Sequence, residues 1–554
     1  MLRIIALSLI LALIPGLGAG WAQEASAPPR TRAELSGYRE TSHHADVLGF
    51  IEALLQRDTG QLDRQSMGQS VLGQDMPVLI LSQDGIRDPA AAREAGKLVV
   101  MVIANIHAGE VEGKEAVLMI ARDLVTGLLP PYHEDLVLVL VPNYNPDGND
   151  QIDPKNRALH LQQLWGQLGP ETGVGTRHTS EGTDLNRDYM LLTAQESRNL
   201  NRLYRHWWPD VFVDCHTTNG SIHAYEMTFD VPHNPASGPT RPIQFARDRM
   251  MPAIRQAVEA RTGFRSFFYG NFRDQNDPES GWETYPAQPR YGSHYRGLTG
   301  RIDILLEAYS YAPFRTRTQV TYEFLREIFA YVQENRAWIR ALTREAEADT
   351  IARGRDPQPD DRVAIDYSVI RRGRDGKPHQ TFPVYPVGPC DITAYDLESM
   401  RAHQAPGKEI TTWRNIHYAR FVPTRSVRRP RAYLVPANQE RVLEMLAQHG
   451  IRTETLPEAR RFASGESYRI LDRVTQERRF GQAAWTESLY WVRNEAQAID
   501  APAGTRLVPM DQPLANVAIY LLEPESDDGL AFWSFFDTTE VGQDFPIQRV
   551  TSLE

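Results

Sequence analysis

Two histidines and one glutamate stand just after predicted strands and could together bind a metal ion. His107 and Glu110 follow the apolar, β-branched run 98–103, which predicts a strand buried on both faces. His216 ends a second apolar run, 211–213. A rigid strand fixes the position of such ligands, and the loop after it frees their direction. Imidazole nitrogens and a carboxylate are good zinc donors, and three of them leave a fourth position for water.

The spacing His-x-x-Glu alone does not establish a metal site. Such pairs also occur in solvated loops and in ordinary polar contacts. The third residue, His216, changes the interpretation because it stands in an equivalent place at a second strand end. The pattern therefore predicts one zinc ion per chain, held by His107, Glu110 and His216.

A glutamate within a later apolar segment is a candidate for acid–base chemistry. Glu307 lies between Leu306 and Ala308 in the segment 301–311, which otherwise predicts a strand. The alternative is an edge strand with Glu307 facing water. If the strand is buried, its apolar neighbours raise the pKa of the carboxyl group. A raised pKa suits a group that takes a proton from water and passes it on.

Length and composition indicate a globular protein with more than one domain. A chain of 554 residues is too long for one ordinary core, and 41% of it is apolar and 24% charged. The formal charge of -11 is a mild acidic excess without a long run of one sign. These features argue against nucleic acid as a partner.

The N-terminus predicts export. Arg3 precedes the apolar run 4–14, and small residues lead to Ala22, which together predict a secretory signal peptide over 1–22. The run is shorter than the ~20 residues that a membrane span requires. We therefore expect a periplasmic or extracellular protein without a retained membrane anchor.

Only two cysteines, Cys215 and Cys390, are present. This number excludes a disulfide framework and a zinc site built from thiolates. The sequence leaves open whether the two form a bridge.

The order of predicted elements favours a mixed α/β fold with a largely parallel sheet flanked by helices. In order, we expect a helix at 42–57, a hairpin at 66–82, a strand at 98–103, a helix at 113–125, a strand at 136–141, a helix at 194–207, strands at 211–213 and 301–311 separated by a helix at 242–260, and a helix at 320–346.

Changes in composition suggest the domain boundaries. After the signal peptide we expect a linker at 23–35, a catalytic domain at 36–348, a second linker at 349–361 and a β-rich C-terminal domain at 362–554. In that last domain we expect strands within 362–370 and 432–435, a helix at 439–448, and a final β-rich region that contains 517–522.

Five segments, taken in order, resemble the carboxypeptidase A-like zinc metallocarboxypeptidase family. They are His107-x-x-Glu110, the Asn-Pro-Asp-Gly turn at 145–148, Asp184-x-Asn186-Arg187, His216 and Glu307. The resemblance covers roughly residues 36–335. It implies a catalytic zinc on His107, Glu110 and His216, with Glu307 as general base.

The resemblance also implies roles around the metal. Asp184 would orient His107, while Asn186 and Arg187 would grip the free C-terminal carboxylate of a peptide. Two family positions stay open. Arg157 and Arg177 both fit the arginine that stabilises the oxyanion, and we choose Arg177. The pocket tyrosine could be Tyr285, Tyr291 or Tyr295, and we choose Tyr285.

The first functional hypothesis is a secreted zinc carboxypeptidase that acts on the C-terminus of peptides or proteins. An N-acyl amino acid deacylase or a cell-wall peptide amidase could use the same site, because their products also carry a carboxylate. A non-catalytic binding protein is a third hypothesis, and Glu307 argues against it. No residue in the sequence indicates which C-terminal side chain is preferred.

Overall fold

The computed structural model describes residues 27–218, 220–372, 378–403, 410–480 and 483–553. The predicted signal peptide at 1–22 lies outside the described residues. Within them, no helix is long and apolar enough to cross a membrane.

The N-terminal part of the molecule is built on an eight-stranded sheet of order β1-β2-β4-β3-β5-β10-β6-β7. Its central strands β4, β3, β5 and β10 are parallel, whereas β2 and β6 pair with them in the antiparallel sense. The mixed, largely parallel sheet predicted from the sequence is therefore confirmed. In sequence order the strands are β1 (Leu62–Gln69), β2 (Asp75–Leu81), β3 (Leu98–Ala104), β4 (Leu136–Val141), β5 (Val211–Thr217), β6 (Met227–Asp230), β7 (Ser266–Phe268) and β10 (Ile302–Ala308).

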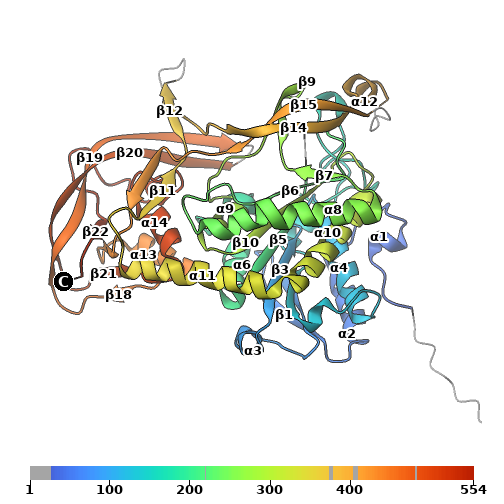
Figure 1. The fold of residues 1–554 in the computed structure, drawn as a ribbon, viewed down its shortest axis with the longest axis horizontal. Coiled ribbons are helices and arrows are strands. Elements are labelled where there is room, and N and C mark those ends of the chain that lie inside the picture. Colours follow the sequence, from blue (N-terminus) through green and yellow to red (C-terminus); the bar gives the residue numbers. More distant parts are fainter. Residues whose placement is uncertain (1–26, 219, 373–377, 404–409, 481–482, 554) are drawn as a thin grey trace, which may run out of the picture.

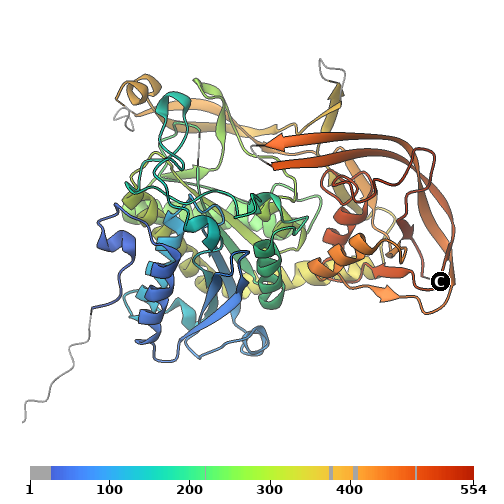
Figure 2. The ribbon, with the colours of Figure 1, turned by 180° about the vertical axis from the view of Figure 1, so that it is seen from behind.

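Helices cover both faces of this sheet. In Figure 1, α8 (Met251–Thr262) and α10 (Phe314–Glu334) lie in front of it, and the opposite view of Figure 2 shows α6 (Gln195–Trp207) on the other side. On β3, Val100 and Val102 belong to one apolar cluster, whereas Met101 and Ile103 belong to another. Both faces of β3 are thus buried, as its continuous apolar run predicts. The other helices of this part are α2 (His44–Leu55), α3 (Pro89–Glu94), α4 (Glu112–Val125), α5 (Pro146–Asn149), α7 (Thr240–Phe245) and α9 (Gly292–Leu298).

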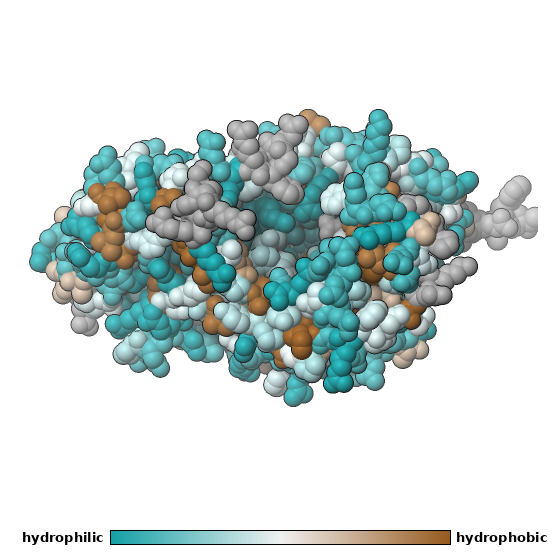
Figure 3. Space-filling model, turned by 90° about the horizontal axis from the view of Figure 1, so that it is seen from above, coloured by the Kyte–Doolittle hydropathy of each residue, from teal (hydrophilic) through white to brown (hydrophobic). Residues whose placement is uncertain are grey.

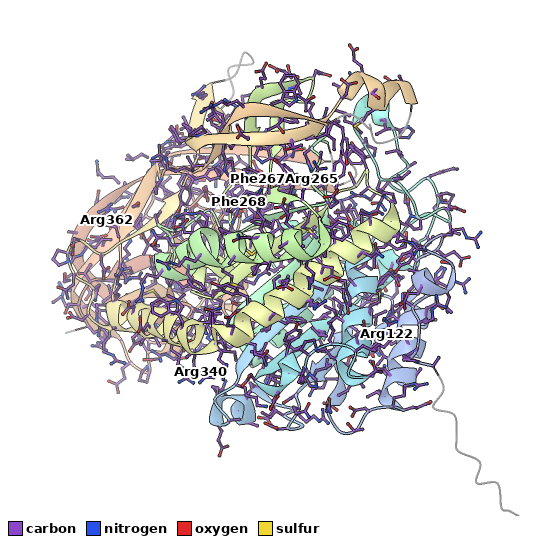
Figure 4. All side chains as sticks on the ribbon, turned by 45° about the vertical axis from the view of Figure 1, so that its right-hand side comes forward. Arg122, Arg265, Phe267, Phe268, Arg340 and Arg362 are labelled. Atoms are coloured by element: carbon purple, nitrogen blue, oxygen red, sulfur yellow. The ribbon has the colours of Figure 1, made fainter. Side chains whose placement is uncertain are left out.

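The segment expected as an N-terminal linker is tied to this part of the molecule. It contains the short helix α1 (Arg32–Leu35), which the side chain of Thr31 caps. Figure 4 shows Arg122 on α4 beside this segment, and its Nη1 lies 2.7 Å from Glu34 Oε2.

The C-terminal part is rich in β-structure, as expected. A six-stranded sheet has the order β18-β21-β17-β22-β19-β20, and the ribbon of β14 and β15 crosses the top of the N-terminal part (Figure 1). There β15 pairs with β9 (Asp277–Glu283), which belongs to the N-terminal part. Seen from above, this face has a hollow near its middle, lined mostly by hydrophilic residues (Figure 3).

The remaining elements, in sequence order, are β8 (Asn271–Asp274), α11 (Arg336–Arg355), β11 (Arg362–Asp366), β12 (Val369–Arg372), β13 (Pro378–Thr381), β14 (Tyr385–Tyr395), α12 (Leu397–His403), β15 (Ile410–Arg420), β16 (Arg425–Arg428), β17 (Ala432–Val435), α13 (Glu440–His449), β18 (Glu454–Thr455), β19 (Arg460–Phe480), β20 (Ala483–Ala501), β21 (Arg506–Pro509), α14 (Ala515–Leu522) and β22 (Gln548–Val550).

Two expectations about secondary structure were wrong. The residues 517–522 form part of helix α14, not a strand. All residues of α14 are buried, so its apolar run has no polar face, and periodicity alone cannot tell such a helix from a buried strand. The helix expected at 320–346 is two helices, α10 and α11, which meet at Asn335. The side chain of Asn335 donates to the carbonyl of Tyr331 at 2.9 Å, a local bond that competes with helix continuation.

Helix α14 also joins the two parts of the molecule. Ile519 and Leu521 share one buried apolar cluster with Leu298 of α9 and with Val363 and Ile365 of β11. The two parts are therefore expected to unfold together.

Replacing Leu521 by Ala tests this shared core. Leu521 is fully buried, so we expect a loss of about 2–5 kcal/mol in the free energy of unfolding. Leu471→Ala is the control, because Leu471 is 51% exposed. Thermal unfolding followed by circular dichroism should show one transition, lowered by Leu521→Ala alone. Two separate transitions, of which the variant shifts only one, would show independent domains.

Candidate metal centre

Three donor atoms converge at one buried point. The Nδ1 atoms of His107 and His216 lie 3.2 Å apart, and Glu110 Oε2 lies 3.1 Å from each of them. Candidate ligand atoms of these three residues all fall within 4.8 Å of one another. Their side chains are at most 3% exposed. Two imidazoles and a carboxylate arranged in this way fit a zinc ion with an open fourth position.

The strand pairing explains why the donors meet. Ala104 at the end of β3 is the register partner of Cys215, so His216 stands beside the point where β3 becomes a loop. Asn105 takes a left-handed conformation there, with φ of 65°. Helix α4 then approaches β5 so closely that a Cβ on Gly113 would lie 2.7 Å from the Cβ of Cys215. Glycine at 113 therefore allows Glu110 to stay close to His216.

A carboxylate supports each histidine from behind. His107 Nε2 lies 3.1 Å from Asp184 Oδ1, and His216 Nε2 lies 3.2 Å from Asp214 Oδ1. Asp184 forms a hydrogen bond with His107 Nε2, whereas Asp214 lies at ion-pair distance from His216 Nε2. With a hydrogen on each Nε2, both Nδ1 lone pairs remain for a metal. Asp184 was expected from the sequence as the partner of His107, whereas Asp214 was not. Its signal was present, because a residue two positions before His216 on a strand lies on the same face.

The second oxygen of Glu110 is held by arginines. Glu110 Oε1 accepts a bond of 2.8 Å from Arg157 Nη1 and one of 3.5 Å from Arg177 Nη1. Burial alone would raise the pKa of Glu110, but His107 and Arg157 outweigh burial and hold that pKa well below its usual value. Glu110 is therefore an anionic donor.

Glu307 lies beside the donors on a central strand. It is the register partner of His216 on β10, which runs between β5 and β6, so the edge-strand alternative is wrong. Burial raises the pKa of Glu307 to about 8; His216 opposes this rise and Glu110 reinforces it. Among the described residues no hydrogen bond to the carboxylate of Glu307 is found, so this group is available to a water molecule or a substrate.

Asn186 and Arg187 stand together on a short turn near the donors. Asn186 Oδ1 accepts a hydrogen bond of 2.9 Å from the backbone amide of Gly292. The side-chain amino group of Asn186 therefore points away from Gly292. The guanidinium carbon of Arg187 lies 4.3 Å from the centre of the Tyr291 ring. Both side chains are partly exposed and can offer N–H donors to a carboxylate.

The geometry bears on the choice between Arg157 and Arg177 as the arginine that stabilises the oxyanion. Arg157 is 10% exposed and bonds to Gln167, Glu110 and the carbonyl of Thr218. Arg177 is 27% exposed and bonds to Asp184 and Glu110. The greater exposure of Arg177 favours it for contact with a substrate.

The three tyrosines occupy different environments. Tyr295 is 2% exposed and its hydroxyl bonds to His449, so it does not face a substrate. Tyr285 and Tyr291 are partly exposed, and their ring centres lie 5.2 Å apart. Of the three, Tyr291 contacts Arg187. The choice of Tyr285 stays a prediction.

The cysteines do not form a bridge. Cys215 is buried on β5, Cys390 lies on β14, and both are free.

Asp214 provides a test of the metal centre. We expect Asp214→Asn to weaken zinc binding by about 10–100-fold, because the carboxylate fixes the tautomer and orientation of His216. His216→Ala should lose most of the zinc. Asp123→Asn is the matched control, since Asp123 is a buried carboxylate paired with Arg122 on α4. Competition with a chelator measures the affinity, and an Asp214→Asn protein that holds zinc as tightly as the parent would contradict the assignment.

Comparison with known proteins agrees with this geometry. Residues 47–222, which include the three donors and the segment 184–187, match the family described as zinc carboxypeptidase, and Glu307 lies beyond the match. Carboxypeptidase 2 of Trichophyton tonsurans is 22% identical over 532 residues, covering 91% of this chain and 85% of the relative. The same protein of Trichophyton equinum is similar to the same extent. Among solved structures, a metallo-carboxypeptidase from Burkholderia cenocepacia is 18% identical, with a TM-score of 0.37 over 52% of this chain and 68% of that one. Over residues 47–222 the chain therefore matches the zinc carboxypeptidase family, and this match identifies it as a zinc metallopeptidase.

Proposed function

We propose that this protein is an exported metallocarboxypeptidase that removes C-terminal residues from peptides, with one zinc ion held by His107, Glu110 and His216. The observation that carries the proposal is the convergence of these donors beside the carboxyl group of Glu307. The pattern of Arg3, apolar run and Ala22 supports export.

Glu307 is the general base of the proposed reaction. Zinc, when bound, supplies a water of lowered pKa and polarises the scissile carbonyl. The Glu307 carboxylate would take a proton from the attacking water and give it to the nitrogen of the leaving amine. Burial raises the pKa of Glu307, which makes its carboxylate a stronger proton acceptor.

Asn186 and Arg187 restrict the reaction to the end of a chain. The amino group of Asn186 and the guanidinium of Arg187 would bind the free carboxylate of the last residue. Arg177 would stabilise the negative charge that develops on the carbonyl oxygen. Asp184 accepts from Arg177 Nε at 2.9 Å while it faces His107, so it links the metal side of the site to the oxyanion side.

An N-acyl amino acid deacylase or a cell-wall peptide amidase is the alternative. Either would use the same metal donors and would bind a carboxylate through Asn186 and Arg187. The relatives named carboxypeptidase 2 cover 91% of this chain, including most of the C-terminal part, and their likeness favours peptides.

Glu307→Gln separates an enzyme from a binding protein. The change keeps the volume of the side chain but removes proton transfer, so we expect kcat to fall at least ~10²–10⁴-fold while peptide affinity survives. Glu327→Gln on α10, where Glu327 pairs with Arg261, is the control. Turnover is measured on a peptide with a free C-terminus after zinc content is checked. Normal turnover by Glu307→Gln would disprove this role.

Arg187→Ala tests the recognition of the carboxylate. A hydrogen bond to a charged group contributes roughly 1.5–3 kcal/mol, so the KM for a free peptide should rise about tenfold to hundredfold. The same peptide with a C-terminal amide should be a poor substrate that is little affected. Arg241→Ala is the control, because Arg241 forms an exposed pair with Glu345. Equal cleavage of the free and amidated peptides by the parent enzyme would contradict the exopeptidase assignment.

A further inference from the structure

Asn186 and Arg187, which are proposed to bind the substrate carboxylate, lie on a segment whose position depends on its contacts with a second segment. We call residues 184–190 the carboxylate segment and residues 285–298 the tyrosine segment. The amide of Gly292 donates to Asn186 Oδ1, and the ring of Tyr291 lies under the Arg187 guanidinium. The fit at Gly292 is tight, because a Cβ there would lie 2.7 Å from a ring atom of Tyr189. The position of the tyrosine segment therefore sets the position of Asn186 and Arg187.

One side chain from the C-terminal part bridges these two segments. His449, the last residue of α13, is fully buried. Its Nδ1 lies 2.8 Å from the hydroxyl of Tyr295, and its Nε2 lies 3.0 Å from the carbonyl oxygen of Met190. The carbonyl can only accept, so Nε2 carries the hydrogen and Nδ1 accepts from the tyrosine. Burial lowers the pKa of His449 to about 4, which keeps the ring neutral in this arrangement.

A second contact from the C-terminal part holds Arg290, within the tyrosine segment. Asp528 is fully buried, and its Oδ1 lies 3.0 Å from Arg290 Nε and 2.9 Å from Arg290 Nη2. Its Oδ2 accepts from the backbone amide of Arg290 at 2.5 Å. The ring of Trp533 packs 4.7 Å from the guanidinium carbon and also donates to Asp528. Arg290 is thus fixed at its backbone and its side chain, one residue before Tyr291.

We propose that the C-terminal part of this chain completes the substrate-carboxylate site, with His449 and Asp528 as positioning residues for Asn186 and Arg187. This inference rests on the proposed function. It gives the C-terminal part a role in the reaction itself. Neither residue touches the substrate, since each acts through the carboxylate segment or the tyrosine segment.

The arrangement of the contacts distinguishes positioning from general packing. Asn201 on α6 donates to the carbonyl of Gln448 at 2.9 Å, one residue before His449, and this bond reaches neither segment. If the C-terminal part only stabilises the fold, losing the bond of Asn201 or the bonds of His449 should have the same kind of effect. A positioning role predicts that only the loss of His449 changes carboxylate recognition.

The experiment measures how strongly each variant prefers a free C-terminus. Every variant is made in the Glu307→Gln background, so that peptides bind without turnover. Isothermal titration of the zinc-loaded protein gives the Kd of one short peptide with a free C-terminus and of its amide. His449→Phe keeps an aromatic ring but removes both hydrogen bonds. We expect it to reduce the amide-to-free ratio of Kd about tenfold, since small misplacements of binding groups are costly.

Three further variants control this result. His449→Gln keeps a donor and an acceptor and should retain most of the preference. Tyr295→Phe removes one side of the bridge, should weaken the preference in part, and serves if His449→Phe does not fold. Asn201→Ala should leave the ratio unchanged. In the Glu307 enzyme, His449→Phe should raise KM for the free peptide much more than it lowers kcat, with zinc content unchanged.

Two outcomes would overturn the proposal in different ways. If His449→Phe or Tyr295→Phe folds, binds zinc and keeps the parent's preference, the positioning role is wrong while the proposed function stands. If the parent itself binds free and amidated peptides equally, the proposed carboxylate site is wrong and the positioning role falls with it.

Discussion

The meeting of two imidazole nitrogens and a carboxylate oxygen in a buried space is the constraint on which the rest of the site depends. Asp184 and Asp214 each face the Nε2 of a histidine, so both Nδ1 atoms turn electron pairs toward each other and toward Glu110. Such an arrangement is repulsive unless a cation lies between the donors. The parallel pairing of β3 with β5 enforces it, because that pairing brings the loop after Ala104 beside His216.

The surrounding charges form a connected set. Glu110 shares its second oxygen with Arg157 and Arg177, and Arg177 continues to Asp184. On the other side, Arg296 lies between Asp214 and Asp303, so the carboxylate behind His216 is itself balanced. Each buried charge has an opposite charge close by, which offsets the cost of removing it from water. The site is in this way rigid before any substrate arrives, as orientation of reacting groups requires.

Much of this could be predicted from the sequence because the signals are local. The continuous apolar runs at 98–103 and 136–141 predicted buried parallel strands, and the donors follow directly from strand ends. Asp214 could also have been found from the sequence, because it stands two positions before His216 on the same strand and therefore lies on the same face. Helix α14 could not, since a segment buried on every side loses the polar face that marks a helix. The bond from His449 to Met190 joins residues 259 positions apart, and no local pattern indicates such a contact.

The central claim is that His107, Glu110 and His216 bind one zinc ion as a set. The most direct measurement is an anomalous difference map, recorded on both sides of the zinc absorption edge from crystals of the zinc-loaded protein. We expect one strong peak, about 2.0–2.2 Å from both Nδ1 atoms and from a Glu110 oxygen, with Glu307 beside it. A zinc peak coordinated by other side chains, or none at this point in a protein that contains zinc, would contradict it.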